Sequence, residues 1–204
     1  MTAFNVAALL TIAAAIFMAE LTDKDAFLLL ALATRRRPLF VFAAGSVAFT
    51  FTTAIITTSG YFLLRIAPVM WIKLVGGAVM IGYGLWEFFK GGEEEKELGK
   101  EKGRVMSVSA KKSVLTAFLS TVGMLALLDL AGDATEILTI VFLAHFQDVV
   151  LVFVGTLTAL IAATALETFL GRQLGRVLSS SRLRILSVLV FLLIGAFTVV
   201  TTVL

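Results

Sequence analysis

Long apolar runs alternate along this chain with short charged segments. The runs lie at about residues 4–33, 39–64, 67–89, 113–144, 149–170 and 183–204. A helix needs about 20 apolar residues to cross the hydrocarbon core of a bilayer, and most of these runs are longer than the helices of soluble cores. The pattern therefore predicts an all-α membrane protein with six transmembrane helices, numbered here as spans 1 to 6 in chain order.

Spans 1 and 4 differ from the others because each is about 30 residues long and contains a polar stretch. A straight helix of that length would measure about 45 Å, well over the roughly 30 Å of the hydrocarbon core. We therefore expect both spans to be kinked or broken at their polar stretches. A broken helix is tolerated at membrane depth only where it lines a cavity enclosed by protein, so the breaks predict where a site lies.

Acidic residues dominate both polar stretches. The first stretch contains Glu20, Thr22, Asp23, Lys24 and Asp25, and the second contains Asp129, Asp133, Thr135 and Glu136. An ionised side chain within hydrocarbon costs roughly 2.5 kcal/mol or more, so six acids beside a single lysine need a functional reason. Carboxylates that face one another, bind cations and exchange protons supply that reason.

The spacing of the acids suits cation binding. On a helix, Glu20 and Asp23 share a face, and so do the three acids of the second stretch. Convergent carboxylates are hard oxygen ligands that suit Ca²⁺, Mg²⁺ or Mn²⁺. Without a cation, crowded carboxylates in a low dielectric take up protons, because desolvation and like charge both favour the neutral form. Cation binding and protonation then exclude each other, which is the physical basis of cation/proton exchange.

We assign roles to these residues as hypotheses. The candidates for binding the cation or the proton are Glu20, Asp23, Asp129, Asp133 and Glu136. The expected metal ligands among them are Glu20, Asp23, Asp133 and Glu136, and the supporting residues are Thr22, Lys24, Asp25 and Thr135. A plainer interpretation is that Glu20 and Lys24, one helical turn apart, form a buried ion pair that only fixes the helices. That pair leaves the second stretch unexplained, although Asp25 and Asp129, taken singly, fit a structural role more easily than the other acids.

An internal repeat relates the two acidic stretches at a spacing of about 110 residues, with Asp23 corresponding to Asp133. The repeat divides the chain into a first three-helix unit at 1–89, a charged linker at 90–112 and a second three-helix unit at 113–204. Units with an odd number of spans lie in opposite orientations. Such inverted repeats place the substrate site near the membrane midplane, between their broken helices.

Basic residues lie mainly on one side of the predicted membrane. The segments after spans 1, 3 and 5 contain Arg35, Arg36, Arg37, Lys90, Lys96, Lys100, Lys102, Arg104, Lys111, Lys112, Arg172, Arg176, Arg182 and Arg184. The segments after spans 2 and 4 contain only Arg65. The positive-inside rule then places the linker 90–112 in the cytoplasm and both termini outside. No basic residue precedes span 1, so that run lacks the start of a signal peptide, and we expect an integral protein of a prokaryotic plasma membrane.

The composition agrees with a membrane protein. Hydrophobic residues make up 59% of the chain, against about 45–50% in soluble domains. The absence of cysteine excludes disulfides and thiolate metal sites. The net charge of +3 comes from segments on one side of the membrane and does not indicate nucleic-acid binding. An enzyme would need a nucleophile or a metal-binding histidine beside the acids, and the single histidine, His145, lies in a predicted outer loop, so we expect neither an enzyme nor a bound cofactor.

The two acidic stretches carry a resemblance to a known motif, Glu-x-Gly-Asp-Lys/Arg-Ser/Thr. The first copy, ELTDKD at 20–25, keeps the glutamate, the aspartate and the lysine, but has threonine for glycine and aspartate for the last position. The second copy, LAGDAT at 130–135, keeps glycine, aspartate and threonine. With its repeat and its central linker, the chain resembles the GDT-type cation/proton antiporters, a branch of the LysE-like transporters. Either Asp129 or Glu136 could supply the acid that the second copy lacks.

The resemblance implies a secondary transporter that exchanges Mn²⁺ or Ca²⁺ for protons by alternating access. The alternatives are a LysE-like exporter of another solute or metal, and a membrane protein that does not transport. The expected partners are divalent cations, protons and the lipid bilayer. The sequence leaves open whether the protein forms a homo-oligomer. Two weaker candidates remain: Glu167, which could pair with Arg172 near the cytoplasmic end of span 5, and the three threonines Thr50, Thr52 and Thr53 of span 2, which could line a path.

Overall fold

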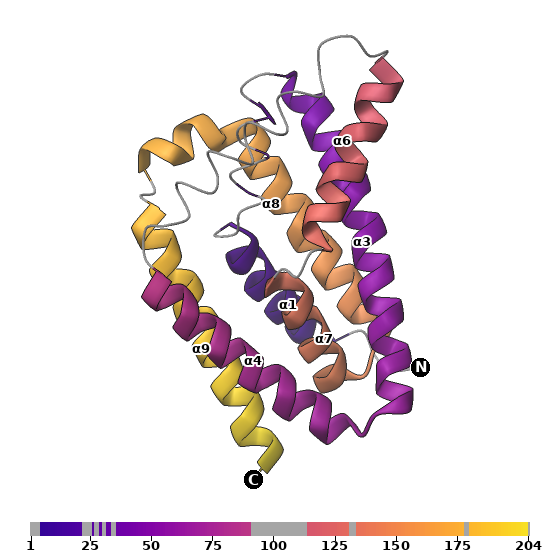
Figure 1. Cartoon of the computed structure of the whole chain (residues 1–204), viewed down its shortest axis with the longest axis vertical. Helices are drawn as coiled ribbons and strands as arrows, with labels where there is room; N and C mark the ends of the chain where they lie inside the picture. Colours follow the sequence, from indigo (N-terminus) through magenta and orange to yellow (C-terminus); the bar gives the residue numbers. More distant parts are fainter. Residues whose placement is uncertain are drawn as a thin grey trace.

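The structure, a computed structural model, describes residues 5–21, 26, 29, 32–33, 36–90, 114–130, 134–177 and 180–203. Within them the chain is helical and contains no strand, which confirms the all-α prediction (Figure 1). The helices are α1 (Val6–Glu20), α3 (Pro38–Ile66), α4 (Val69–Lys90), α6 (Val114–Asp129), α7 (Ala134–Phe146), α8 (Val149–Val177) and α9 (Ser180–Val203). We call the end of the bundle at which α3 and α6 begin, at the top of Figure 1, the upper end.

The helix ends follow from local chemistry. Pro38 opens α3, where its missing N–H group costs nothing because the first amides of a helix have no partner within it. Between α7 and α8, Gln147 adopts a left-handed conformation with φ of 53°, and its N–H donates to the carbonyl oxygen of Leu143 at 2.9 Å. The next residue, Asp148, accepts a hydrogen bond from the N–H of Leu151 at 3.0 Å and so caps α8. Two residues therefore suffice to reverse the chain.

The helical segments end at the acidic stretches, as the sequence predicts. Glu20 is the last residue of α1. Asp129 is the last residue of α6 and Ala134 is the first residue of α7, while residues 131–133 between them lie outside the described part of the chain. One boundary differs from the prediction, because α8 continues to Val177 instead of ending near Leu170.

Within the described part of the chain, three helices are long and apolar enough to cross a membrane by length and composition, at Pro38–Ile66, Val69–Trp86 and Val149–Leu170. Shorter apolar helices lie at Val6–Glu20, Val114–Leu127, Thr135–Phe146 and Val188–Val203. Large apolar side chains such as Phe51, Phe62 and Trp71 are exposed on the outside of the bundle. A soluble protein rarely exposes so much contiguous apolar surface, so this surface fits contact with lipid.

The described helices pack in related pairs. α1 packs against α8, α6 packs against α3, α3 contacts α8, and α4 contacts α9 (Figure 1). Glycines allow backbones to approach closely at these contacts. A Cβ atom at Gly155 of α8 would lie 2.8 Å from Cγ2 of Ile12 of α1. A Cβ atom at Gly195 of α9 would lie 2.8 Å from the carbonyl oxygen of Gly77 of α4.

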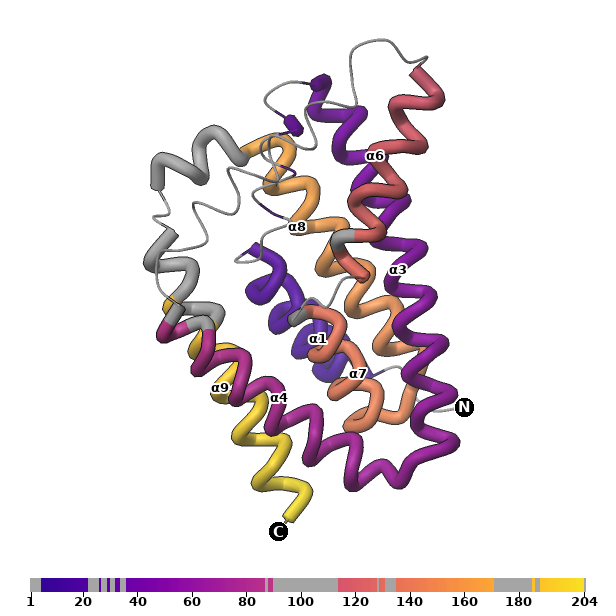
Figure 2. The backbone as a smooth tube through the Cα atoms, in the orientation of Figure 1, coloured from indigo at the N-terminus to yellow at the C-terminus, as the bar shows by residue number. Residues whose placement is uncertain are grey.

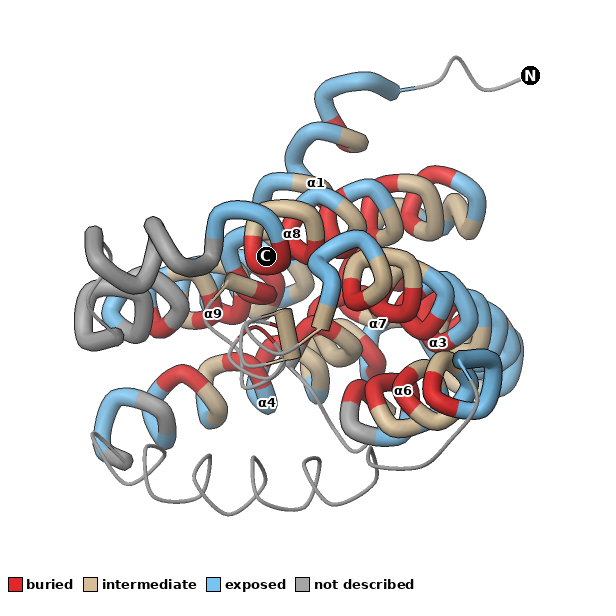
Figure 3. The backbone as a smooth tube through the Cα atoms, turned by 90° about the horizontal axis from the view of Figure 1, so that it is seen from above, coloured by how far each residue is buried: buried red, intermediate tan, exposed pale blue. Residues whose placement is uncertain are grey.

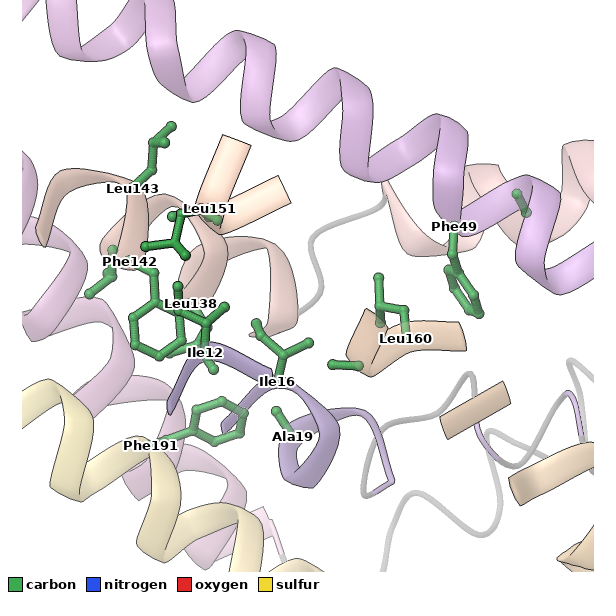
Figure 4. Close-up of a cluster of buried hydrophobic side chains, with 14 of the residues drawn as sticks. Ile12, Ile16, Ala19, Phe49, Leu138, Phe142, Leu143, Leu151, Leu160 and Phe191 are labelled. Carbon is green, nitrogen blue, oxygen red and sulfur yellow. The ribbon is translucent and has the colours of Figure 1, made fainter. Parts of the chain in front are cut away.

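The buried side chains of the described residues form a core centred on α1, α3, α7 and α8, to which α4, α6 and α9 contribute Met80, Leu125 and Phe191. Ile12, Ile16, Leu138 and Phe49 are completely or almost completely buried in it (Figure 4). Figure 3, which looks along the bundle from above, shows buried positions on the facing sides of α3, α7 and α8 and exposed positions on the outer side of α3. The turns of α1 and α6 that precede their acidic ends therefore belong to this core.

Candidate functional site

Glu20 occupies the last turn of α1. Its side chain is 0% exposed, and neither carboxylate oxygen has appreciable contact with solvent. The preceding turns are held in the core by Ile12 and Ile16 (Figure 4). The apolar packing of α1 therefore fixes an acid inside the protein at the point where the helix ends.

Asp129 occupies the corresponding place at the end of α6 and is 3% exposed. The next helix, α7, carries Thr135 and Glu136 in its first turn. Thr135 is buried, and Glu136 is half-buried with its Oε1 atom shielded from solvent. Two acids and a threonine therefore flank the break between α6 and α7.

The helix ends add an electrostatic contribution that favours a cation. The C-terminal end of a helix carries about half a negative charge, because its last carbonyl groups have no partner within the helix. Glu20 and Asp129 each place a carboxylate at such an end, so the two negative potentials add. Glu136 lies instead at the N-terminal end of α7, where the dipole stabilises an ionised carboxylate. The arrangement concentrates negative potential where α1 and α6 stop.

The contact between α1 and α7 brings their acids to the same side of the core. Ile12 of α1 lies beside Leu138 and Phe142 of α7 (Figure 4). The two helices run in opposite directions, as the colours along the chain show (Figure 2). At about 1.5 Å per residue, Glu20 lies about 12 Å and Glu136 about 3 Å beyond this contact, both toward the upper end.

Hydroxyl groups lie on the neighbouring helices. The Oγ1 atoms of Thr139 in α7 and Thr156 in α8 are 3.4 Å apart. Thr53 in α3 is 3% exposed, and its hydroxyl has no hydrogen-bond partner within the described residues. The hydroxyls of its buried neighbours Thr52 and Thr57 donate instead to carbonyl oxygens of their own helix. Thr53 is therefore distinct from the threonines around it.

Thr53 lies on the face of α3 that contacts α7. It precedes Gly60 by two helical turns, and a Cβ atom at Gly60 would lie 2.7 Å from Cδ2 of Leu143 in α7. α3 and α7 run in the same direction (Figure 1). Seven residues before Leu143 along α7 is Glu136. This register places Thr53 at the level of Glu136.

Five of the predicted site residues lie outside the described part of the chain: Thr22, Asp23, Lys24, Asp25 and Asp133. The predicted approach of Asp23 to Asp133 therefore stays a prediction. Among the residues that are described, no three His, Asp or Glu side chains gather closely enough to hold a metal ion. A complete carboxylate site would need the contributions of Asp23 and Asp133.

The structure makes two residues, Thr53 and Glu167, stronger candidates for the functional site than the sequence does. Thr53 was one of three threonines that sequence reasoning could not tell apart, because the pattern shows a hydroxyl but not its hydrogen-bond partner. Glu167 is buried in α8, and its position within an apolar run was the available signal. His145 is exposed at the end of α7, in agreement with the prediction of a surface histidine.

Comparison with known proteins adds an independent finding. A family model described as divalent cation/proton antiporter GDT1 matches residues 8–95 and 117–203. The unmatched interval, 96–116, falls in and just after the predicted linker. Neither the comparison with curated proteins nor the comparison with solved structures gave a match.

Proposed function

The chain belongs to the divalent cation/proton antiporter GDT1 family, and on that basis we propose that it exchanges Mn²⁺ or Ca²⁺ for protons across a membrane. The observation that carries the proposal is the position of the buried acids. Glu20 and Asp129 each end a helix inside apolar surroundings, and Glu136 follows in the next helical segment. Buried acids at interrupted membrane helices are typical of ion pathways and proton relays.

In the proposed site, the carboxylates of both acidic stretches bind one divalent cation as the transported substrate. The proposed ligands are Glu20, Asp23, Asp133 and Glu136, with Asp129 as a further cation- or proton-binding acid. Thr22, Lys24, Asp25 and Thr135 support them. No resident cofactor takes part in this proposal. Protons replace the cation on the same carboxylates. The site therefore carries the cation across the membrane in one direction and protons in the other.

We propose that the six spans form two inverted three-helix units, at 1–89 and 113–204, joined by the linker 90–112. The packing supports this arrangement, because exchanging the units turns the α1–α8 contact into the α6–α3 contact, and both contacts are present. In this exchange α3 corresponds to α8 and α4 to α9, so the α3–α8 and α4–α9 contacts are unchanged by it. Alternating access then moves one set of helices relative to the other around the acids.

In the proposed orientation the linker lies in the cytoplasm and both termini lie outside, and the upper end of the bundle is cytoplasmic. The chain has no cysteine, so a single cysteine introduced at Ser107 would be the sole thiol. We expect an impermeant maleimide added to intact cells to leave Ser107→Cys unlabelled, and to label it after the cells are opened. Labelling in intact cells would reverse the orientation.

Flux into proteoliposomes tests the function itself. We expect uptake of Mn²⁺ or Ca²⁺ to be driven by an outwardly directed proton gradient and to move protons in return. The apparent affinity for the cation should weaken as the pH falls, because protons compete for the same carboxylates. A panel of monovalent ions and amino acids serves as the control. Uptake of another solute, with no response to Mn²⁺ or Ca²⁺, would favour the LysE-like exporter instead.

Thr53 supplies a third test, because its hydroxyl is a candidate neutral ligand beside Glu136. We expect Thr53→Val to raise the KM for the cation by roughly fivefold, which corresponds to a net loss of about 1 kcal/mol. The melting temperature should stay the same or rise, since the variant removes a buried hydroxyl that has no partner within the described residues.

The matched control for this test is Thr57→Val, on the same helix and equally buried. The Thr57 hydroxyl donates to the carbonyl oxygen of Thr53 at 2.7 Å, so its removal should leave the KM unchanged. Equal KM values for both variants and the wild type would remove Thr53 from the ligand set.

A further inference from the structure

Glu167 is a buried acid that the proposed ligand set does not use. It lies in α8 within the apolar stretch Val149–Leu170, is 5% exposed, and has both carboxylate oxygens shielded from solvent. An acid at such a depth is costly and is retained mainly where it serves a pathway or an ion pair. The side chain of Arg172, the partner expected from the sequence, lies outside the described side chains.

The face of α8 that carries Glu167 points into the bundle. Thr156 precedes Glu167 by 11 residues, which is three helical turns, so the two residues share a face. Thr156 approaches Thr139 of α7 to within 3.4 Å between their Oγ1 atoms. Thr164, three residues before Glu167, faces α3, because its Cγ2 atom lies 2.9 Å from the position that a Cβ atom at Gly45 would take. The carboxylate is therefore on the side of α8 that faces the other helices.

The contact between α1 and α8 gives the depth of Glu167 relative to Glu20. The helices meet at Ile12 and Gly155 and run in the same direction toward the upper end (Figures 1 and 2). From that contact Glu20 lies about 12 Å along α1, and Glu167 lies about 18 Å along α8. Among the described residues, Glu167 therefore lies beyond Glu20 toward the upper end, by about 6 Å measured along the two helices.

We propose that Glu167 is a second station for the divalent cation, between the central acids and the upper end of the bundle. This inference rests on the proposed function. A single carboxylate binds a hydrated divalent cation weakly, and ions pass through proteins rapidly where successive sites are strong enough to fill and weak enough to empty. Glu167 receives the cation from the central acids, or delivers it to them, and sets the rate of exchange with the upper side.

The test uses the full-length protein in proteoliposomes with Mn²⁺ as the probe. We expect Glu167→Gln to lower the maximal rate of Mn²⁺ uptake by about tenfold or more, as mutation of groups that support a metal site typically does. The Kd for Mn²⁺ at the central site should stay near that of the wild type. It is read in detergent from the rise in melting temperature with Mn²⁺ concentration.

Thr168→Val is the matched control, because Thr168 is the next residue along α8 and is equally buried. Its hydroxyl donates to the carbonyl oxygen of Thr164 at 2.6 Å, and the variant should transport at the wild-type rate. A folded Glu167→Gln variant that transports at the wild-type rate overturns the inference. So does a variant whose Kd for Mn²⁺ rises while its melting temperature and transport rate fall, because that result assigns Glu167 to an ion pair that holds α8.

If Glu167→Gln does not fold, Glu167→Asp replaces it, since this variant keeps the charge and withdraws the carboxylate by one methylene group. A lowered rate with an unchanged Kd supports the station, and a wild-type rate overturns it. The proposed function fails separately, if the wild type itself transports neither Mn²⁺ nor Ca²⁺. Wild-type transport with an unaffected Glu167 variant overturns only the present inference.

Discussion

Glu20→Gln should abolish cation transport while leaving the protein folded. Glu20 ends α1 with its side chain completely buried, and the change removes one charged ligand and one proton carrier together. Mutation of a residue that only supports a metal ligand lowers metal affinity or activity by about 10–100-fold. Loss of a ligand itself should therefore lower Mn²⁺ uptake by at least about 100-fold. The measurement is uptake into proteoliposomes across a range of pH, with the melting temperature recorded for the same preparation.

The melting temperature separates two roles of Glu20. If the charge of Glu20 serves to bind the cation, Glu20→Gln removes the cost of burying that charge. Without bound cation, the variant should then be at least as stable as the wild type. If Glu20 forms a structural ion pair with Lys24, the variant leaves a buried charge behind, and the free energy of unfolding should fall by about 3–5 kcal/mol. Glu20→Asp keeps the charge and is the control for side-chain shape. Normal uptake by Glu20→Gln would exclude Glu20 from the site.

Asp23→Asn and Asp133→Asn should each abolish flux, although 110 residues separate them in the chain. The repeat places them at corresponding positions of the two acidic stretches, and a shared site predicts that losing either one is as damaging as losing both. Asparagine keeps the shape and one neutral oxygen ligand while removing the charge. Mn²⁺ uptake by the single and double variants provides the measurement, and the double variant should be no worse than either single one.

Asp129→Asn and Glu136→Gln complete that series. The second motif copy lacks its glutamate, and either residue could replace it. If one of these two variants loses Mn²⁺ uptake as fully as Asp133→Asn does, the mutated residue is the one that replaces the missing motif glutamate. If Asp23→Asn and Asp133→Asn both transport normally, the acidic stretches are structural and the proposed function loses its site.

The ends of α1 and α6 were predictable because a charged side chain within a long apolar run has a large free-energy cost. Glu20 and Asp129 are such residues, and the helices end at them. The extension of α8 to Val177 was not predictable in this way. Residues 171–176 contain two glycines and two arginines, which read as a loop, but a helix that leaves the hydrocarbon core can continue where arginines reach the interface.

The contacts between helices of the first and the second three-helix unit could not be predicted from the sequence pattern. Thr53 could be recognised as polar, but its difference from Thr52 and Thr57 depends on rotamers and on the approach of α7 at Gly60. Glu167 could be recognised as a buried acid. Its depth relative to Glu20 depends on the crossing of α1 and α8 at Gly155, which no periodicity encodes.

The close approach of α4 and α9 limits how the two halves can move. A Cβ atom at Gly195 would lie 2.8 Å from the carbonyl oxygen of Gly77, 2.9 Å from Cγ1 of Ile81 and 3.1 Å from the backbone nitrogen of Ile81, so the two backbones lie close together at this point. Translation of α9 along α4 would bring a neighbouring side chain against a carbonyl group, whereas rotation about the crossing point would not. We therefore expect the pair to act as a pivot, so that spin labels at the far ends of α4 and α9 change their separation during transport more than labels beside the glycines.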